Sequence, residues 1–348
     1  MIRKKRKREH LLIASRLKDG PCSTGFEDIR LIHHSVPELD LEEIDPGIEF
    51  LGKGMEYPLI INALTGGTDQ AKRINKALAY VAEKYGIALA VGSQTIALED
   101  SGLRDTFAVV REMNPGGVIL ANLSANRSVE EALEAIDMIQ ADGLQLHLNV
   151  PQELTMKEGD RCFRGILKNV SEIVTRAPVP VFAKEVGFGF SREAALELYT
   201  AGIRYMDNGG QGGTNFLAIE NQRKGLFGDT MNDWGIPTAI SLAEVVSLQL
   251  PIFVVVSGGI RTASDVVKAL ILGADAVSIT GLFLNILLTD GIEALDQFME
   301  NLLYQIRAVF LMIGAHNCQE LKQKPLIITG TTAQWLYSRG IDPQQWSR

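Results

Sequence analysis

The chain has 348 residues, 46% of them hydrophobic, and its 42 acidic side chains outnumber 34 basic ones, which gives a net charge of −8. No apolar run reaches the roughly 20 residues that a membrane-spanning helix needs, so we expect no membrane partner. Three cysteines, Cys22, Cys162 and Cys318, lie far apart without CxxC spacing. This spacing argues against a zinc site or a disulfide framework and favours a reducing, cytoplasmic location.

Six consecutive basic residues, Arg3 to Arg8, stand near the N-terminus, so the rest of the chain carries 28 basic against 42 acidic side chains. An acidic body of this kind is not typical of a general nucleic-acid binder, and we expect no nucleic-acid partner. No apolar stretch of signal-peptide length follows the basic run. The run itself has two interpretations, a solvated tail or an arm that folds over an anionic substrate.

Residues 20–56 form a polar leading segment punctuated by Pro and Gly, and we expect it to cap the bottom of the fold or to begin a short hairpin. From Tyr57 onward, apolar runs alternate with amphipathic segments. The apolar runs predict strands at Leu59–Ala63, Ile87–Val91, Val118–Asn122, Leu144–Asn149, Val179–Lys184, Tyr205–Asn208, Ile252–Val256 and Ala276–Ile279. The segments between and after them predict helices at Asp69–Lys84, Leu103–Met113, Val129–Gln140, Gly165–Arg176, Arg192–Thr200, Ala239–Ser247, Thr262–Leu272 and from Ile292 to Leu311.

Eight alternations with mostly short connections predict an α/β fold, a closed (β/α)8 TIM barrel, rather than an open doubly wound sheet. No GxGxxG motif follows the first strand, which also counts against a Rossmann fold. We therefore expect a single domain. It comprises an arm and leading segment at 1–56, a barrel at 57–315 and a C-terminal tail at 316–348.

Glycine and polar residues follow most of the predicted strands, and in a barrel these carboxyl ends meet on one face. The last two strands end at Gly258-Gly259 and at Thr280-Gly281, where (β/α)8 barrels usually build a phosphate site. We expect a phosphate-bearing ligand there, although such glycines also occur in simple tight turns. The long connection from Gly209 to Pro237 is predicted to lie over this face as a lid.

Three charged or titratable residues on the same face have more than one interpretation. Lys184 ends an apolar run, where it could hold an anion, form a Schiff base, or pair with a carboxylate such as Glu153. His147 is equally compatible with a buried histidine that makes its hydrogen bonds within the core and with an acid–base group. Glu153 could bind a hard cation such as Mg²⁺ together with substrate phosphates. These residues alone do not indicate which reaction the protein catalyses.

The strand ends taken together resemble one family, the type 2 isopentenyl diphosphate isomerases, which are FMN-dependent barrels. The matching motifs, which extend over nearly the whole chain, are RKREH at 6–10, NALTGG at 62–67, VGSQ at 91–94, ANLS at 121–124, LQLHLNVPQE at 144–153, EGDRCFRG at 158–165, KEVGFG at 184–189, GGQGGTNF at 209–216, NDWGIPT at 232–238, SGGIR at 257–261 and PLIITG at 325–330.

This resemblance implies cofactors and site residues. The residues implied to bind FMN are Ala63, Leu64, Thr65, Ser93, Asn122, Lys184, Thr214, Gly258, Gly259, Ile260, Arg261, Thr280 and Gly281. Those implied to bind the substrate diphosphate are Arg6, Lys7, Ser93, Gln94 and Gln152, with Mg²⁺ on Glu153. The basic run would then be an arm over the substrate. The family usually forms tetramers or octamers, so the resemblance also implies a homo-oligomer.

The reaction implied is a 1,3-allylic proton shift between isopentenyl and dimethylallyl diphosphate. FMN is reduced, usually by NADPH, and the resemblance assigns proton transfer to the reduced flavin at N5. Lys184 would stabilise the anionic flavin, His147 would orient or tune nearby groups, and Gln152 would position the substrate. Thr95 stands where some relatives carry a basic residue, which puts one diphosphate contact in doubt.

The alternative is an FMN-dependent oxidoreductase of the hydroxy-acid oxidase type. Such an enzyme needs a histidine–arginine pair near the seventh strand, and only Arg261 stands there. A nucleotide dehydrogenase would need a nucleophilic cysteine in the loop from Gly209 to Asn215, which has none. A flavin-binding or phosphate-sensing protein without catalysis is a third possibility.

Overall fold

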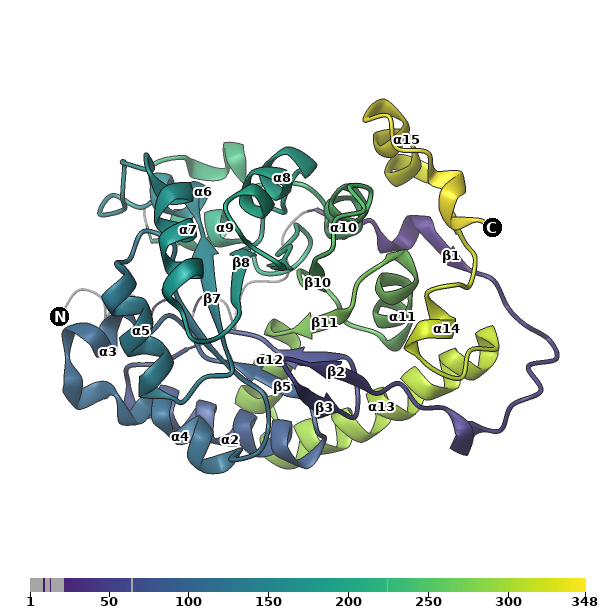
Figure 1. Cartoon of the computed structure of the whole chain (residues 1–348), viewed down its shortest axis with the longest axis horizontal. Coiled ribbons are helices and arrows are strands. Elements are labelled where there is room, and N and C mark those ends of the chain that lie inside the picture. The colour runs from purple at the N-terminus through teal and green to yellow at the C-terminus, as the bar shows by residue number, and fades with distance from the viewer. Residues whose placement is uncertain (1–8, 10–12, 14–21, 64, 224) are drawn as a thin grey trace.

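A closed barrel of eight parallel strands forms the centre of the computed structural model, which describes residues 9, 13, 22–63, 65–223 and 225–348 (Figure 1). Each predicted apolar run supplies one strand, with ends that differ by at most a few residues. The strands are β4 (Leu59–Ile61), β5 (Ala88–Ala90), β6 (Ile119–Ser124), β7 (Gly143–Leu148), β8 (Val181–Glu185), β9 (Tyr205–Asp207), β10 (Phe253–Val256) and β11 (Ala276–Ile279). Each strand pairs with the next, and β11 pairs with β4 to close the ring. The predicted TIM barrel is confirmed.

The predicted helices cover the outside of the barrel. They are α2 (Asp69–Lys84), α4 (Asp105–Met113), α5 (Val129–Met138), α7 (Ile166–Arg176), α8 (Arg192–Thr200), α10 (Thr238–Val246), α11 (Ala263–Leu272) and α13 (Ile292–Ile313). The hydroxyls of Ser128 and Ser191 accept hydrogen bonds from the first turns of α5 and α8, so both are N-caps. Shorter helices lie in the connections: α3 (Thr95–Glu99), α6 (Val150–Thr155), α9 (Phe216–Gln222) and α12 (Gly281–Thr289).

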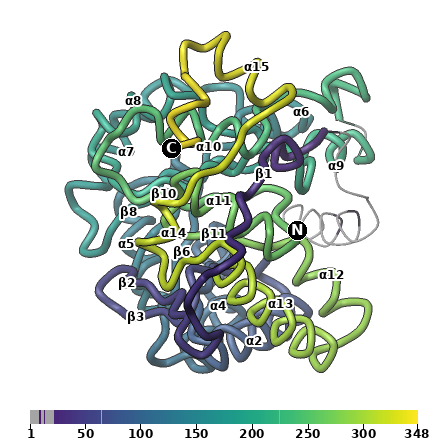
Figure 2. Tube along the Cα trace, turned by 90° about the vertical axis from the view of Figure 1, so that its right-hand side faces the viewer, coloured from purple at the N-terminus to yellow at the C-terminus, as the bar shows by residue number. Residues whose placement is uncertain are grey.

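The leading segment closes the amino end of the barrel with a hairpin, β2 (Ile48–Phe50) and β3 (Lys53–Met55). The ring of Phe50 packs against two strand residues, with its centroid 5.9 Å from that of Phe182 and 4.9 Å from that of Phe253. The ring of Tyr205 completes this aromatic cluster. In Figure 2 the hairpin lies on one side of the molecule and α9 and α12 lie on the other, so the carboxyl ends of the strands open away from the hairpin.

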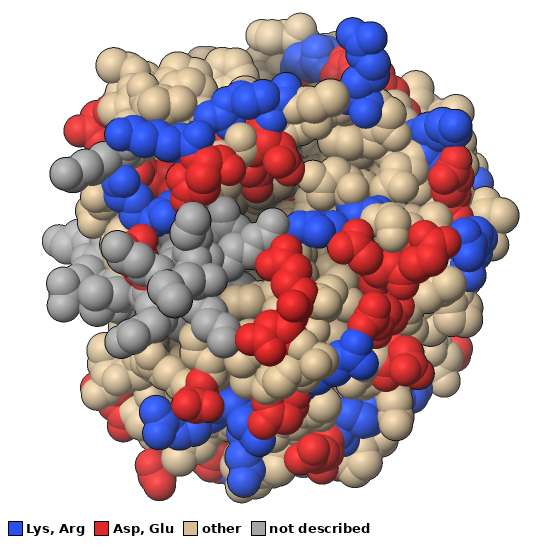
Figure 3. Space-filling view, turned by 90° about the vertical axis from the view of Figure 1, so that its left-hand side faces the viewer, with Lys and Arg blue, Asp and Glu red and all other residues tan. Residues whose placement is uncertain are grey.

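Charged side chains of both signs are interspersed over the side of the molecule in Figure 3, rather than forming one continuous basic surface. Among the described residues, no helix combines the length and apolar character required to span a bilayer.

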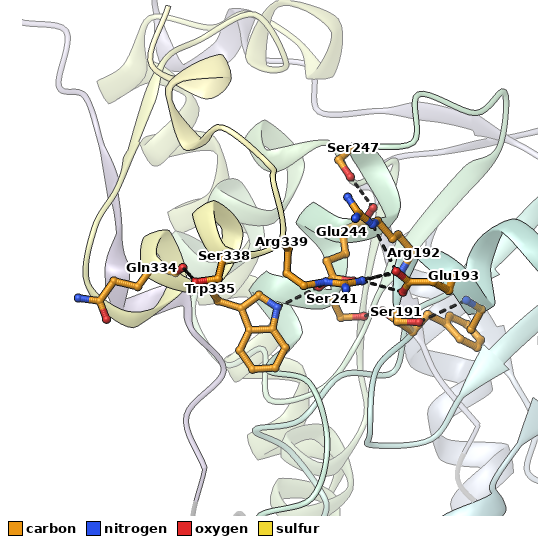
Figure 4. Close-up of polar contacts among 12 residues, drawn as sticks. Ser191, Arg192, Glu193, Ser241, Glu244, Ser247, Gln334, Trp335, Ser338 and Arg339 are labelled. Carbon is orange, nitrogen blue, oxygen red and sulfur yellow. Dashed lines mark hydrogen bonds and ion pairs between the residues drawn. The ribbon is translucent and has the colours of Figure 1, made fainter.

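The C-terminal residues pack against the barrel. Strand β12 (Leu326–Ile328) pairs with β1 (Ile29–Leu31) of the leading segment, and α15 (Gly330–Ser338) lies beside α10. The buried Glu244 of α10 accepts hydrogen bonds from Trp335 Nε1 and Arg339 Nε, each at 2.9 Å, and Arg339 also pairs with Glu193 of α8 (Figure 4). A buried carboxylate with charged and neutral donors therefore joins the last helix to two barrel helices.

The aromatic cluster predicts a large contribution of the hairpin to stability. Replacing the buried Phe50 by Ala removes its contacts with Phe182 and Phe253, and we expect a loss of about 3 kcal/mol in the free energy of unfolding. Denaturant titration measures this loss, with the exposed Tyr304→Ala as the matched control that stays near the wild type. A loss below about 1 kcal/mol for Phe50→Ala would mean that the hairpin is not needed to close the barrel.

Candidate active site

Side chains inside the barrel change from aromatic to polar along β8 and β9. Phe182 and Lys184 are two residues apart on β8. Because alternate residues of a strand point to the same side, both side chains face the interior of the barrel. The same spacing on β9 separates Tyr205 from Asp207, and Lys184 stands in register with Asp207. The interior is therefore apolar near the hairpin and polar at the carboxyl ends, as barrel enzymes require.

Asp207 is the centre of the polar end. Its side chain is fully buried, and Lys184 Nζ lies 2.6 Å from its Oδ2, with the lysine side chain only 8% exposed. Asn62 donates to the same oxygen, and the Ser257 hydroxyl donates to the other. The ion pair with a neighbouring strand-end carboxylate, one of the alternatives for Lys184, is thus present, and its partner is Asp207 rather than the example Glu153. These three donors hold the Asp207 side chain in place, and Asp207 in turn fixes the position of the Lys184 amine.

A row of side-chain hydrogen bonds extends from Asp207 across the barrel. Asn62 Oδ1 accepts from Gln145 Nε2 at 3.0 Å, and Gln145 Oε1 accepts from Asn122 Nδ2 at 3.1 Å. Asn122 Oδ1 lies 3.0 Å from His147 Nδ1. Because an amide oxygen only accepts, the arrangement assigns the proton to His147 Nδ1.

Ser93 and Gln94, two residues predicted to bind ligands, follow β5, and their side chains point in different directions. The hydroxyl of Ser93 lies 3.2 Å from that of Thr95 at the rim. Gln94, by contrast, is fully buried, where Nε2 donates to the Ala135 carbonyl at 2.9 Å and Oε1 accepts from the Asn122 amide at 3.0 Å. The side chain of Gln94 therefore fastens β6 to α5 and is not brought to the face with the other predicted residues.

Two predicted residues begin the helix that follows β7. Gln152 is buried and donates through Nε2 to Glu220 Oε1 of α9 at 3.1 Å. Glu153 accepts from Asn149 Nδ2 and from the Asp160 amide, each at 2.9 Å. Within the described part of the chain, no group of three or more His, Cys, Asp or Glu side chains could hold a metal ion. The role of Glu153 as a ligand of Mg²⁺ stays a prediction.

The glycines after β10 form a cradle of backbone. Gly258 and Gly259 have φ values of +109° and +76°, and a Cβ on them would lie 2.1 Å from Gly210 O and 2.3 Å from Gly212 O. Only glycine fits such an approach. Arg261 holds the two loops together by donating to the carbonyls of Gly259 at 2.6 Å and Gly212 at 2.8 Å.

The start of α12 lies beside this cradle. A Cβ built on Gly281 would be 3.6 Å from the Thr214 hydroxyl, so the loop after β9 and the end of β11 approach each other. The residue before the helix, Thr280, makes no side-chain cap hydrogen bond to its first turn. Backbone N–H groups at a helix start, beside glycine loops, suit the phosphate of a nucleotide-like cofactor. The two glycine ends therefore fit the phosphate site that the sequence predicts.

Three further predicted residues lie in the described part of the chain. Thr65 is buried with its carbonyl 3.1 Å from the Gly92 amide, Ala63 donates its amide to Asn62 Oδ1 at 2.8 Å, and Ile260 is buried in the hydrophobic core. Arg6, Lys7 and Leu64 lie outside the described residues. Sequence reasoning gave no role to Asp207, Asn62, Gln145, Ser257 or Glu220. Polar residues inside otherwise apolar strands were the available signal for the first three.

Glu185, next to Lys184 in β8, is a buried carboxyl that faces away from this row. Burial raises the pKa of Glu185 to about 8, although hydrogen bonds from the Phe188, Val186 and Gly189 amides and the nearby Lys184 charge lower it. Phe188 N lies 2.6 Å from its Oε2. The carboxyl therefore anchors the turn after β8.

The chain is similar to several known proteins in sequence and in fold. The sequence profile described as FMN-dependent dehydrogenase matches residues 168–328. The isopentenyl-diphosphate delta-isomerase of Moorella thermoacetica is 49% identical over 337 residues, which cover 97% of each chain. That of Symbiobacterium thermophilum is 44% identical, with coverage of 98% of this chain and 97% of the relative.

Among solved structures, a mandelate oxidase variant with an FMN monooxide adduct superposes with a TM-score of 0.66, at 18% identity over 92% of each chain. A lactate oxidase of Pediococcus acidilactici gives the same TM-score at 16% identity, with 88% of this chain and 84% of that chain covered. At these identities the likeness is one of fold alone.

Removing the charge of Asp207 is predicted to destabilise the protein, because Lys184 is left buried without its counter-ion. We expect Asp207→Asn to lower the free energy of unfolding by about 3 kcal/mol, and Lys184→Met in the same chain to restore part of the loss. Denaturant titration is the measurement. The exposed Asp105→Asn, which breaks a surface pair with Lys72, is the control and should resemble the wild type. An Asp207→Asn protein as stable as the control would contradict the assignment.

The raised pKa of Glu185 predicts a pH dependence. Between the ordinary glutamate value of 4.5 and about 8, the unfolded chain has lost the proton that the folded chain keeps. The stabilisation from this group is therefore complete below pH 4.5 and lost as the pH rises through 8. Urea titrations from pH 5 to 8.5 give the free energy of unfolding at each pH. We expect Glu185→Gln to remove the part of its decline that comes from this group, whereas the exposed Glu197→Gln should keep that decline. If the free energy of unfolding fell with pH in the same way in both variants and in the wild type, Glu185 would be ionised in the folded state.

Proposed function

The chain belongs to the isopentenyl-diphosphate delta-isomerase family, of the FMN-dependent type, and we propose that it interconverts isopentenyl and dimethylallyl diphosphate at the face described above. The observation that carries the proposal is the joint presence of a glycine cradle for a phosphate and a buried lysine–aspartate pair on one rim of the barrel. The relatives are aligned over nearly their whole length, so the proposal applies to the chain as a whole.

FMN fits the residues on this face. Its phosphate would be held by the backbone of Gly258, Gly259 and Gly281 with Thr280 and Thr214 beside it, and Arg261 would keep the two loops in place. The flavin ring would lie near the remaining predicted residues, which are Ala63, Leu64, Thr65, Ser93, Asn122, Lys184 and Ile260. When bound and reduced, FMN supplies acid–base exchange with a carbon–carbon double bond at no net redox cost.

The protein's own residues prepare this environment. Lys184, fixed by Asp207, places a positive charge where negative charge on a reduced ring is stabilised. His147, held by Asn122 through Nδ1, presents Nε2 as a proton donor or acceptor to groups at the face. Gln152, held by Glu220, orients the substrate from α6. A dry site favours the reaction, because cationic character on an alkene carbon is quenched by water.

The diphosphate end of the substrate would be bound by Ser93 and Gln152, with Arg6 and Lys7 from the basic run and Mg²⁺ on Glu153. Gln94 has its side chain directed into the packing between β6 and α5, so in this proposal it positions Asn122 rather than touching the phosphates. NADPH is proposed as the reductant of FMN. We further propose a cytoplasmic homo-oligomer, a tetramer or octamer.

The second candidate, an oxidase of 2-hydroxy acids, is suggested by the fold shared with mandelate and lactate oxidases. Those likenesses are at 18% and 16% identity, whereas the relatives that carry the isomerase name reach 49%. The barrel fold is therefore common to isomerases and 2-hydroxy-acid oxidases, and the two activities differ in the residues of the site and not in the fold.

The deciding experiment is an anaerobic incubation of the purified protein with FMN, NADPH, Mg²⁺ and isopentenyl diphosphate. We expect dimethylallyl diphosphate to form without net consumption of NADPH, and no product when the flavin is kept oxidised. In deuterated solvent, deuterium should appear in the methyl group that forms from the terminal methylene of isopentenyl diphosphate, which would report the proton shift directly. Failure to form product under reducing conditions, together with flavin reduction by a 2-hydroxy acid such as mandelate, would replace the isomerase by the oxidase.

A further inference from the structure

Thr238, the first residue of α10, lies between the two glycine loops of the cradle. Its side chain is fully buried, and its hydroxyl oxygen lies 2.7 Å from the Gly258 carbonyl oxygen and 3.0 Å from that of Gln211. A hydroxyl carries one proton, and the shorter distance assigns it to Gly258, with Gln211 as a second acceptor. Thr238 therefore connects the loop after β10 to the loop after β9.

Neighbouring contacts leave this hydroxyl little freedom to move. The Thr238 amide donates to the Gln211 carbonyl at 3.1 Å, and the Thr238 carbonyl accepts from Asn208 Nδ2 at 3.2 Å. A Cβ on Gly210 would lie 2.4 Å from the Thr238 Cα, so the first turn of α10 packs directly against the loop backbone. The hydroxyl is therefore held at a fixed point beside the Gly258 carbonyl.

The bond to the Gly258 carbonyl also sets the direction of the next amide. Because a peptide unit is planar and trans, the N–H of Gly259 points opposite to the carbonyl of Gly258, and thus away from Thr238. Among the described residues, this N–H meets no backbone acceptor. It is therefore available for an acceptor that a ligand supplies.

Gly213 keeps this amide open. A Cβ on Gly213 would lie 2.6 Å from the Gly259 nitrogen, so a side chain there would crowd the N–H. The hydroxyl of the adjacent Thr214 lies 3.6 Å from the Cβ position of Gly281, at the start of α12. The Gly259 amide, Thr214 and the helix start are thus brought together, as the binding of a phosphate requires.

We propose that Thr238 is a positioning residue for the FMN phosphate, which acts through the peptide unit between Gly258 and Gly259 and does not touch the cofactor. Its hydroxyl keeps the Gly259 N–H directed toward the phosphate. Without that bond the peptide unit can rotate, because glycine on both sides offers no steric resistance, and a rotated unit would present a carbonyl oxygen to the anion. This inference rests on the FMN site of the proposed function and adds to it the residue that orients the cradle.

Flavin binding by the full chain tests the proposal, because FMN and riboflavin differ only in the phosphate. We expect Thr238→Val, which removes the hydroxyl and keeps the shape of the side chain, to raise the Kd for FMN about threefold to tenfold. The Kd for riboflavin should stay at its wild-type value. Thr238→Ser, which keeps the hydroxyl, should bind both flavins like the wild type. Quenching of flavin fluorescence on titration of the flavin-free protein measures both constants.

Thr155→Val is the matched control. Thr155 is also fully buried, but its hydroxyl donates to the Pro151 carbonyl of its own helix, α6, at 2.8 Å. Both valine variants should lose stability in urea titrations, whereas only Thr238→Val should lose preference for FMN over riboflavin. An equal loss of affinity for the two flavins in Thr238→Val, or an unchanged Kd for FMN, would overturn the proposal. If Thr238→Val does not fold, Thr238→Ala takes its place with the same expectation.

A further variant acts on the amide and leaves the hydroxyl in place. Gly213→Ala should raise the Kd for FMN and not that for riboflavin, since the new methyl group crowds the Gly259 N–H. An unchanged preference for FMN in this variant would also overturn the proposal, because the amide would then have no part in binding the phosphate. If the wild type binds FMN but forms no dimethylallyl diphosphate, the proposed function fails, while the two binding constants still decide the role of Thr238.

Discussion

The buried pair of Asp207 and Lys184 is the interaction on which the proposed site depends. A lysine in the interior of a barrel is costly unless a carboxylate accompanies it, and the carboxylate itself needs further donors. Asn62 from the end of β4 and Ser257 from the end of β10 supply them. The ends of four strands are thereby linked through the Asp207 carboxylate. The position of the Lys184 ammonium is fixed before any ligand binds.

The same barrel interior serves two purposes at its two ends. Near the hairpin, the rings of Phe50, Phe182 and Phe253 fill the space and supply apolar burial. At the carboxyl ends, amide and carboxylate side chains form the hydrogen-bonded row from Asp207 to His147. A polar row of this kind is tolerated because its members satisfy one another, and it fixes the orientation of each amide.

Electrostatics pose a particular problem for a protein with a net charge of −8 whose proposed substrate and cofactor are both anionic. The surface in Figure 3 carries both signs of charge, so attraction must come from local features. Backbone amides at Gly258, Gly259 and the start of α12 suit the cofactor phosphate without adding charge. The densest positive charge in the sequence is the run of six basic residues from Arg3 to Arg8, which is proposed to bind the diphosphate.

The positions of the strands and helices could be predicted from the amino-acid sequence, because apolar runs and glycine ends are local patterns: this applies to all eight strands, all eight barrel helices and the glycines after β10 and β11. Which side chains meet depends on how the strands are arranged in the barrel. Lys184 pairs with Asp207 rather than Glu153 because β8 and β9 are neighbours in register, a relation that spacing along the chain does not contain. Gln94 likewise reads as a face residue beside Ser93, yet the turn after β5 directs it toward α5. Direction and partner are set by closure of the barrel, which joins residues more than a hundred positions apart, such as Asn62 and Asp207.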